Sequence, residues 1–333
     1  MRTPPPGTPP RLHDGRCSPG VARRDRTCRT PDRVPGQFRH RPWDLPIRLW
    51  ARRVCAGTEQ SYSARVDEPP AARTVFRVEH LGEIGSTNRE LVHRAREGAE
   101  SGLVLVADHQ TAGRGRSERR WLDSPGASLL MSVLVRPRAP ADRLHLYGTA
   151  LALAARSAAE SFCGDLSSAE AGITLKWPND LVVDHADRTW RKLAGVLVET
   201  GFEDNRPSWL VLGLGLNLDT PELPRSDPGL DPVGLREVAS GPVSRDDLTE
   251  AVLAELDTRL ELIRAGAGGW ILREARRESA VLGRAVTVEE ADGTLVGTAV
   301  DIDDSGRLVV RSGGVNTPLV TGDVSRLRPA LED

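Results

Sequence analysis

The change of pattern near residue 282 constrains the fold of this 333-residue chain more than any other feature. Before it, apolar runs of strand length alternate with longer stretches of helical spacing. Strands are expected at residues 74–78, 103–107, 128–135, 173–176, 181–183, 191–199 and 209–217, with helices from residue 86, at 142–161 and twice within 244–280. Ser86 or Thr87 is the expected N-cap of the first helix. This order predicts an α+β domain with a mixed sheet.

After residue 282 the expected strands are short and are separated by tight turns. They fall at residues 284–288, 295–300, 308–310 and 317–320, with Asp292-Gly293, Ser305-Gly306 and Gly313-Gly314 between them. Asp-Gly between alternating runs is typical of a β-hairpin. We therefore expect a small β-barrel or sandwich in a separate domain of residues 281–330, after a larger domain of residues 74–280.

Composition limits the remaining possibilities. Residues 1–70 are rich in Arg, Pro and Gly without apolar periodicity, which predicts a disordered extension or a start site placed too early. The net charge of −2 argues against a general binder of nucleic acid or membrane surfaces. The chain has no apolar run of about 18 residues and no signal-peptide core. Its four cysteines lack metal or disulfide spacing, so a soluble cytoplasmic protein is expected.

Lysine is nearly absent from this arginine-rich chain. All of the 45 basic residues except Lys176 and Lys192 are arginine. Lysine is a compact point charge that reaches a single oxygen, whereas arginine is a planar fork. Because both lysines fall inside the motifs described next, we expect them to serve a ligand. The alternative is that they lie on the surface by chance and bind no ligand.

The first candidate for ligand binding is Gly113-Arg114-Gly115-Arg116, which follows the buried strand predicted at 103–107. Glycines let the backbone approach a ligand closely, and guanidinium groups fit phosphate or carboxylate oxygens. Arg119 and Trp121 come shortly after, and Trp121 offers an aromatic face for stacking on a nucleobase. A Gly/Arg surface loop without a ligand would have the same pattern.

Two further candidates contain the lysines. Lys176-Trp177-Pro178-Asn179-Asp180 gathers a lysine, an amide and a carboxylate around a proline turn, a set suited to a phosphate and a magnesium ion held by Asp180. An Asn-Asp turn beside an exposed lysine is the alternative. Lys192 opens an apolar strand whose buried residues would hold its charge at one spot. There it would stabilise a carboxylate attacking a phosphate.

Gly213-Leu214-Gly215-Leu216-Asn217 is the fourth candidate, in which small residues leave room for a flat ligand against a strand. The third glycine and following helix of a dinucleotide-binding fingerprint are missing. The sequence also lacks a His/Cys cluster suited to zinc and a GxSxG nucleophile elbow.

These motifs together resemble the biotin–protein ligase family. The matching segments are Ser86-Thr87-Asn88, residues 110–116, 176–180 and 191–199, and residues 213–218, in the order that the family has them. The likeness covers roughly residues 75–330, and five motifs in sequence are highly specific. The resemblance implies an α+β catalytic domain with a mixed sheet, followed by a small SH3-like β-barrel.

The resemblance also implies roles for individual residues. Ser86, Thr87, Asn88 and Gln110 would hold the ureido end of biotin, while Arg114, Gly115 and Arg116 belong to a loop that orders over biotin and the adenylate. Lys192 would contact the biotin carboxylate and the reacting phosphate. Arg119, Trp121, Lys176, Asn179 and Asn217 are the residues expected to bind ATP, and Asp180 its Mg²⁺. Lys192, Arg116 and Asp180 are the catalytic candidates.

The chain departs from the family pattern at two places. Many members have glycine where this chain has Glu118. Members that double as repressors begin with a winged helix, for which residues 1–70 lack helical periodicity and apolar content. The resemblance therefore implies a ligase without a DNA-binding domain, with no specific nucleic acid or membrane as partner. It would act as a monomer or as a ligand-dependent homodimer.

The implied reaction has two steps. Biotin and ATP give biotinyl-AMP and pyrophosphate, and the biotinyl group then passes to a lysine of the biotin carboxyl carrier domain of an acyl-CoA or pyruvate carboxylase. Asp180 is our candidate for orienting the attacking amine or accepting its proton. A lipoate–protein ligase of the same architecture is the nearest alternative. A biotin-responsive DNA-binding regulator that uses the N-terminal arginines is an alternative from another class.

Overall fold

A computed structural model describes residues 74–116, 119–164, 171–185, 190–221, 230–290, 293–320 and 322–326. The extension expected at residues 1–70 and the departure at Glu118 lie outside these ranges. Seven strands form the larger sheet, in the order β1-β2-β3-β7-β6-β5-β4. The β1 and β2 strands pair in parallel, and the other neighbours pair antiparallel. The sheet is therefore mixed, which confirms the predicted fold class.

The strands of this sheet follow the expected apolar runs. They are β1 (Arg77–Ile84), β2 (Leu103–Gln110), β3 (Ser128–Val135), β4 (Ala171–Lys176), β5 (Asp180–His185), β6 (Trp190–Glu203) and β7 (Arg206–Asn217). The first strand was expected at 74–78 but begins at Arg77, because its partner on β2 begins at Leu103 and residue 77 is the first to pair with it. It also continues to Ile84, past the predicted end.

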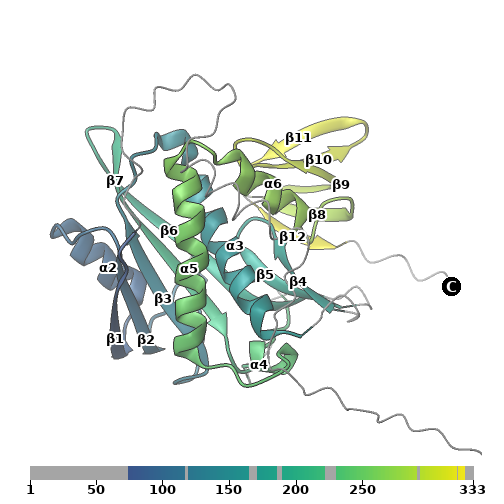
Figure 1. Cartoon of the computed structure of the whole chain (residues 1–333). Coiled ribbons are helices and arrows are strands. Elements are labelled where there is room, and N and C mark those ends of the chain that lie inside the picture. The colour runs from purple at the N-terminus through teal and green to yellow at the C-terminus, as the bar shows by residue number, and fades with distance from the viewer. Residues whose placement is uncertain are drawn as a thin grey trace, which may run out of the picture. The chain divides into compact units, whose positions relative to one another are not determined.

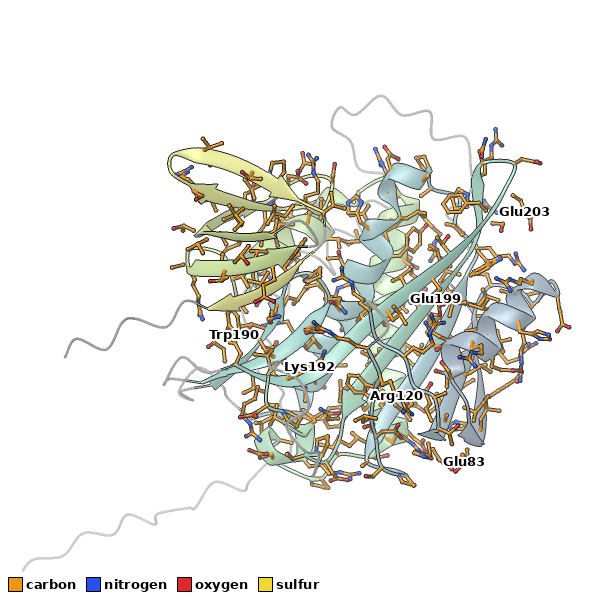
Figure 2. The ribbon with its side chains drawn as sticks, turned by 180° about the vertical axis from the view of Figure 1, so that it is seen from behind. Glu83, Arg120, Trp190, Lys192, Glu199 and Glu203 are labelled. Atoms are coloured by element: carbon orange, nitrogen blue, oxygen red, sulfur yellow. The ribbon has the colours of Figure 1, made fainter. Side chains whose placement is uncertain are left out.

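Helices cover both faces of the sheet, and alternate residues of β2 show the division. Val104 and Val106 pack in the large core with α3 (His145–Phe162), α5 (Arg245–Arg264) and α6 (Gly269–Arg277). Leu103 and Leu105 point to the other side and pack with α2 (Thr87–Arg96). Helices α3 and α5 lie side by side over the first face (Figure 1). The opposite face, which we call the α2 face, is turned toward the viewer in Figure 2.

The first turn of α2 is stabilised differently from the prediction. Ser86 occupies the N-cap position with extended backbone angles, but its side chain makes no capping hydrogen bond. Instead the Thr87 N–H donates to Oε1 of Gln110, at 2.7 Å. A side chain from β2 therefore satisfies a backbone donor that the helix leaves free.

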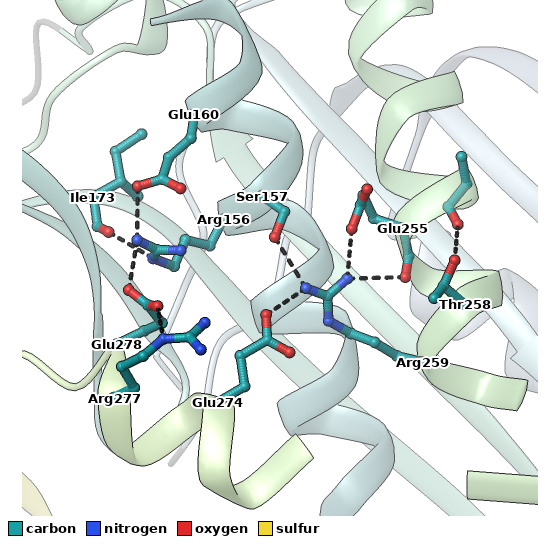
Figure 3. Close-up of polar contacts among 11 residues, drawn as sticks. Arg156, Ser157, Glu160, Ile173, Glu255, Thr258, Arg259, Glu274, Arg277 and Glu278 are labelled. Atoms are coloured by element: carbon teal, nitrogen blue, oxygen red, sulfur yellow. Dashed lines mark hydrogen bonds and ion pairs between the residues drawn. The ribbon is translucent and has the colours of Figure 1, made fainter. Parts of the chain in front are cut away.

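Ion pairs join the helices on the face of α3 and α5 (Figure 3). Arg259 of α5 lies 2.6 Å from Glu274 of α6 and 2.8 Å from Glu255, and it also donates to Ser157 of α3. Arg259 and Glu274 are 6% and 7% exposed. Burial alone would lower the pKa of Arg259, but the two carboxylates raise it above its ordinary value. The guanidinium thus stays charged and holds three helices together.

The C-terminal sheet has five antiparallel strands in the order β11-β10-β9-β8-β12. They are β8 (Ala285–Glu290), β9 (Gly293–Ile302), β10 (Leu308–Ser312), β11 (Val315–Leu319) and β12 (Asp323–Arg326). This confirms the predicted small β-module, although the apolar pattern did not reveal β12, which pairs with β8. The residue at which a second domain was expected, 281, falls between α6 and β8.

Contacts from the first sheet hold the C-terminal sheet. The side chains of Trp177 and Trp190 complete its apolar core. The Trp177 indole N–H also donates to the carbonyl of Gly306, at 3.0 Å. Arg284 forms an ion pair of 2.6 Å with Asp184 of β5. Trp177 therefore fixes the motif at 176–180 against the second sheet.

One short helix, α4 (Leu235–Val238), lies between β7 and α5, and a 3₁₀ turn, η1 (Ala141–Arg143), precedes α3. The expected helices at 142–161 and within 244–280 are confirmed by α3, α5 and α6. Among the described residues, none of the helices is long and apolar enough to cross a membrane.

Candidate active site

Two glycines make the floor of the candidate site on the α2 face of β7. Leu212 and Leu214 point into the large core, so Gly213 and Gly215 point to the opposite side. A Cβ on Gly213 would overlap the amide of Asn88, and one on Gly215 would lie 2.6 Å from Cε2 of Trp121. The space beside these glycines is occupied by the side chains of Asn88 and Trp121, and a flat ligand against the strand stays a prediction.

A buried polar cluster lies beside Gly213. The Thr87 N–H and hydroxyl both contact Oε1 of Gln110, at 2.7 and 3.1 Å. Asn88 donates from Nδ2 to Oε2 of Glu199, at 3.0 Å. Ser86, Thr87 and Asn88 are each at most 5% exposed. The structure thus brings the four predicted head-group residues together where α2 begins and β2 ends. Directional donors and acceptors at this depth suit a small polar ligand group.

Two members of this cluster were missed from the sequence. Ser132 of β3 is fully buried, and its Oγ lies 2.8 Å from Oγ1 of Thr87 and 2.6 Å from Oδ1 of Asn88. Glu199 is the last residue of the motif at 191–199. A serine inside an otherwise apolar strand was the available signal for the first, and an acidic residue ending a buried strand was the signal for the second.

The Gly/Arg loop folds back on itself beside this cluster. The Gly115 N–H donates to the carbonyl of Arg119 at 2.7 Å, and Trp121 donates to the carbonyl of Gly113 at 3.1 Å. Gly113 is required here, because a Cβ would lie 2.6 Å from the Trp121 carbonyl oxygen. These bonds join the two ends of the loop to each other.

Two arginines of the loop reach across to the sheet. Arg114 lies 3.2 Å from Oε1 of Glu199 on β6. Arg116 donates to Oδ1 of Asn179 at 3.1 Å, and the Nδ2 of that amide donates to the Val196 carbonyl. The loop predicted from glycine and arginine spacing therefore contacts the motif at 176–180.

Lys192, Asp180 and Trp121 converge over Gly195. The Nζ of Lys192 lies 2.9 Å from Oδ1 of Asp180 and 5.9 Å from the centre of the Trp121 ring. A Cβ on Gly195 would be within 3.5 Å of all three side chains. Lys192 is one third exposed, so its charge is accessible from the α2 face (Figure 2). The indole N–H of Trp121 is buried and has no hydrogen-bond partner among the described residues.

Asn217 forms a hydrogen bond with the backbone of Lys192. Its Nδ2 donates to the carbonyls of Lys192 and Val233, at 3.2 and 3.3 Å. The described contacts therefore use this amide to position the backbone of Lys192. Lys176 lies opposite Asp180 in the β4–β5 pair, which puts both on one face, and it is 8% exposed. Within the described residues, no group of three or more His, Cys, Asp or Glu is arranged to hold a metal.

The arrangement joins three chemical capacities on one face of a rigid sheet. It offers a buried cluster of amides and hydroxyls, a loop with guanidinium groups, and a lysine beside a carboxylate. Together these suit a substrate with a polar, uncharged head and a carboxylate that reacts at a phosphate.

Comparison with known proteins identifies the family. The model described as "Biotin/lipoate A/B protein ligase family" matches residues 83–217, and "Biotin protein ligase C terminal domain" matches residues 281–327. The biotin–[acetyl-CoA-carboxylase] ligase of Mycobacterium tuberculosis is 36% identical over 252 residues, which cover 74% of this chain and 88% of that protein. The chain belongs to the biotin protein ligase family. The resemblance found in its sequence is confirmed.

Other members of the biotin protein ligase family show the same relationship. The bifunctional ligase/repressor BirA of Escherichia coli is 28% identical, over 73% of this chain and 71% of that protein. The biotin protein ligase from Aquifex aeolicus in complex with biotin and ATP superposes with a TM-score of 0.61 at 25% identity, covering 76% of this chain and 99% of that one. In the described part of this chain β1 is the first element, so no winged helix is seen there.

Proposed function

We propose that this chain is a biotin–protein ligase, which converts biotin and ATP to biotinyl-AMP and passes the biotinyl group to a lysine of a carrier protein. One observation above all supports this. The polar cluster at Thr87 and Asn88 and the Lys192–Asp180 pair lie on the same sheet face, joined by the Gly/Arg loop. The Aquifex relative binds biotin and ATP, the two substrates that this arrangement suits.

In the first step an oxygen of the biotin carboxylate attacks the α-phosphorus of ATP. The P–O bond to pyrophosphate breaks, and pyrophosphate leaves with its electron pair. Lys192 neutralises charge on the attacking carboxylate and on the phosphate oxygens. Thr87, Asn88 and Gln110 hold the ureido group, so that the carboxylate stays in position for attack.

In the second step a neutral amine of the carrier attacks the acyl carbon of biotinyl-AMP. The new C–N bond replaces the C–O bond to AMP, and the amine loses a proton. Asp180 is placed beside Lys192 to orient this amine and accept the proton. Before transfer, Arg114 and Arg116 keep the loop over the mixed anhydride and exclude water.

The donor set also fits magnesium that arrives with ATP. Mg²⁺ is commonly bound through one or two carboxylates together with substrate phosphates. Asp180 would supply one carboxylate, and the nucleotide-binding candidates stay Arg119, Trp121, Lys176, Asn179 and Asn217. When bound, the ion would neutralise phosphate charge. Because the ion would arrive with ATP, the residues of this chain would bind and orient the nucleotide and would not form a permanent metal site.

The carrier is the partner that this reaction requires. We propose the biotin carboxyl carrier domain of an acyl-CoA or pyruvate carboxylase, in keeping with the acetyl-CoA-carboxylase ligases among the relatives. Action as a monomer or a ligand-dependent homodimer, and a cytoplasmic location, stay predictions.

The deciding experiment is exchange of labelled pyrophosphate into ATP, with biotin, lipoate and octanoate supplied separately. Biotin alone should support exchange, because the polar cluster matches a ureido group. The matching family model also includes lipoate ligases, so the lipoate arm is essential. Exchange with lipoate instead would retain the adenylation chemistry and reject the substrate. A folded protein without exchange would reject the proposal.

A further inference from the structure

Glu199 has no part in the chemistry proposed above, although it lies in the middle of the site. On β6 it is opposite Val211 of β7, and Val211 packs in the core on the α2 side. Glu199 therefore points to the same face as the polar cluster (Figure 2). Its side chain is 27% exposed, so the carboxylate is partly accessible where it lies between the polar cluster and the Gly/Arg loop.

The two oxygens of this carboxylate contact two separate segments of the chain. Oε2 accepts a hydrogen bond of 3.0 Å from Nδ2 of Asn88, at the start of α2. Oε1 lies 3.2 Å from a guanidinium nitrogen of Arg114, in the Gly/Arg loop. The polar cluster and the Gly/Arg loop are thus connected through one side chain.

The carboxylate also determines how the Asn88 amide is oriented. An ionised carboxylate accepts hydrogen bonds and donates none, so the NH₂ group of Asn88 must face Glu199. The amide oxygen then faces Ser132, whose Oγ is 2.6 Å away. A reversed amide would place its oxygen against the carboxylate. The Nδ2 also donates to the carbonyl of Leu197, at 3.4 Å, so Glu199 supplies the shorter and charged of the two contacts that fix which polar atoms Asn88 offers in the cluster.

We propose that Glu199 is a positioning residue that orients Asn88 in the polar cluster and tethers the Gly/Arg loop over this cluster. This inference rests on the proposed function, because it assumes that the pocket holds the biotin head and that the loop covers the adenylate. Through Glu199, the order of the pocket and the closure of the loop depend on each other.

The substitution Glu199→Gln tests this link at nearly constant size. Asn88 and Arg114 contact different oxygens of Glu199, and glutamine replaces one of these oxygens with an NH₂ group that donates and cannot accept, so one of the two contacts is lost. The Arg114–Glu199 pair is partly exposed, at 47% and 27%. Pairs of this kind change an equilibrium by roughly two- to fivefold. We expect loop opening to increase by that factor in Glu199→Gln and in Arg114→Gln.

Two measurements on the full chain report this opening. The first is the rate of trypsin cleavage after Arg120, which lies at the exposed end of the loop. This assay requires neither biotin nor ATP. The second is adenylate leakage, measured as biotin attached to non-carrier lysines for each pyrophosphate released. Both should rise in each single variant, and in the double variant they should rise no further. Glu203→Gln, at an exposed position farther along β6, should leave both unchanged.

The pocket arm of the proposal has its own readout. Glu199→Gln should also raise the KM for biotin in the exchange assay, because Asn88 loses its charged acceptor and keeps only the longer contact of 3.4 Å with the carbonyl of Leu197 to orient its amide. Wild-type cleavage and wild-type KM in a variant with an unchanged melting temperature would overturn the proposal, as would multiplying effects in the double variant. If Glu199→Gln does not fold, unchanged cleavage in Arg114→Gln overturns the tether. Absence of biotin-dependent exchange in the wild type would instead reject the proposed function, and the trypsin assay would still test the tether.

Discussion

The two faces of the seven-stranded sheet use charged residues in opposite ways. Under α3, α5 and α6, Arg259 and Glu274 are almost fully buried and paired, and they join helices to each other. On the α2 face, Lys192 and Arg114 are one third and nearly one half exposed, and both are themselves candidates for ligand binding. The difference indicates that charge on the first face maintains the fold, whereas charge on the second face is kept accessible for chemistry.

Removing the charge of Lys192 should give the largest effect on activity. Loss of one group that stabilises developing charge lowers a rate by about 100- to 1,000-fold. We expect this decrease in pyrophosphate exchange for both Lys192→Ala and Lys192→Met, with little change in the melting temperature because the side chain is partly exposed. Near wild-type exchange in Lys192→Met would show that the stem of this side chain matters and its charge does not.

Glu274→Leu should lower the stability of the protein and leave its activity unchanged, the opposite of the Lys192 variants. It leaves the buried guanidinium of Arg259 with Glu255 as its remaining carboxylate partner, and breaking a buried pair costs about 3 kcal/mol or more. Denaturant unfolding should detect this loss, while the folded fraction should retain wild-type exchange activity. Glu250→Leu, at an exposed position of α5, is the matched control. A variant of normal stability but low activity would contradict the division between the two faces.

The sequence was sufficient to predict much of this division. Helical spacing located α3, α5 and α6, and strand-length apolar runs located the sheet. Lys192 stood out because the chain has two lysines, and its neighbour in the structure, Asp180, was already a candidate. The elements were predicted correctly because they depend on local periodicity, which a single sequence displays directly, whereas the roles of Lys192 and Asp180 stay predictions.

What the sequence did not reveal depends on pairing between distant segments. Asn88 and Glu199 are 111 positions apart and meet because β6 lies beside β7 below α2. Ser132 reaches Thr87 and Asn88 because β3 also lies against α2. β12 pairs with β8, which lies far from it along the C-terminal segment. Neither register nor strand order can be derived from spacing alone, so these contacts required the structure.

Gly213→Ala should have a smaller effect that is confined to the α2 face. The added methyl group overlaps the Asn88 amide, and overpacking of this kind costs roughly 1–3 kcal/mol. Because the strain falls on the polar cluster, we expect the KM for biotin to rise about tenfold or more, as 1.4 kcal/mol corresponds to a factor of ten. Gly82→Ala on β1, where an added Cβ meets nothing within 4 Å, should leave the KM unchanged. An unchanged KM in Gly213→Ala would separate the cluster from biotin binding.

The smallest expected effect is a pH dependence that belongs to the structural face alone. His145 begins α3 and lies against the β9–β10 turn of the C-terminal sheet, where a Cβ on Gly306 would be 2.8 Å from its ring. Burial lowers the pKa of His145, and this outweighs the opposing effects of Asp142, Asp303 and Asp304. The unfolded chain therefore binds the proton more readily than the native one. Stability should be complete above the unfolded pKa of about 6.5 and should decrease as the pH falls below it.

Denaturant unfolding between pH 8 and pH 5 measures this dependence, and His145→Gln should reduce its slope, whereas His80→Gln at an exposed position of β1 should not. The same titration also distinguishes the two faces. Because His145 contacts the C-terminal sheet and belongs to none of the site residues, its substitution should leave the pH profile of pyrophosphate exchange unchanged under conditions where the protein stays folded. A shifted activity profile would mean that the structural face communicates with the catalytic one, and that the separation of roles between them is incomplete.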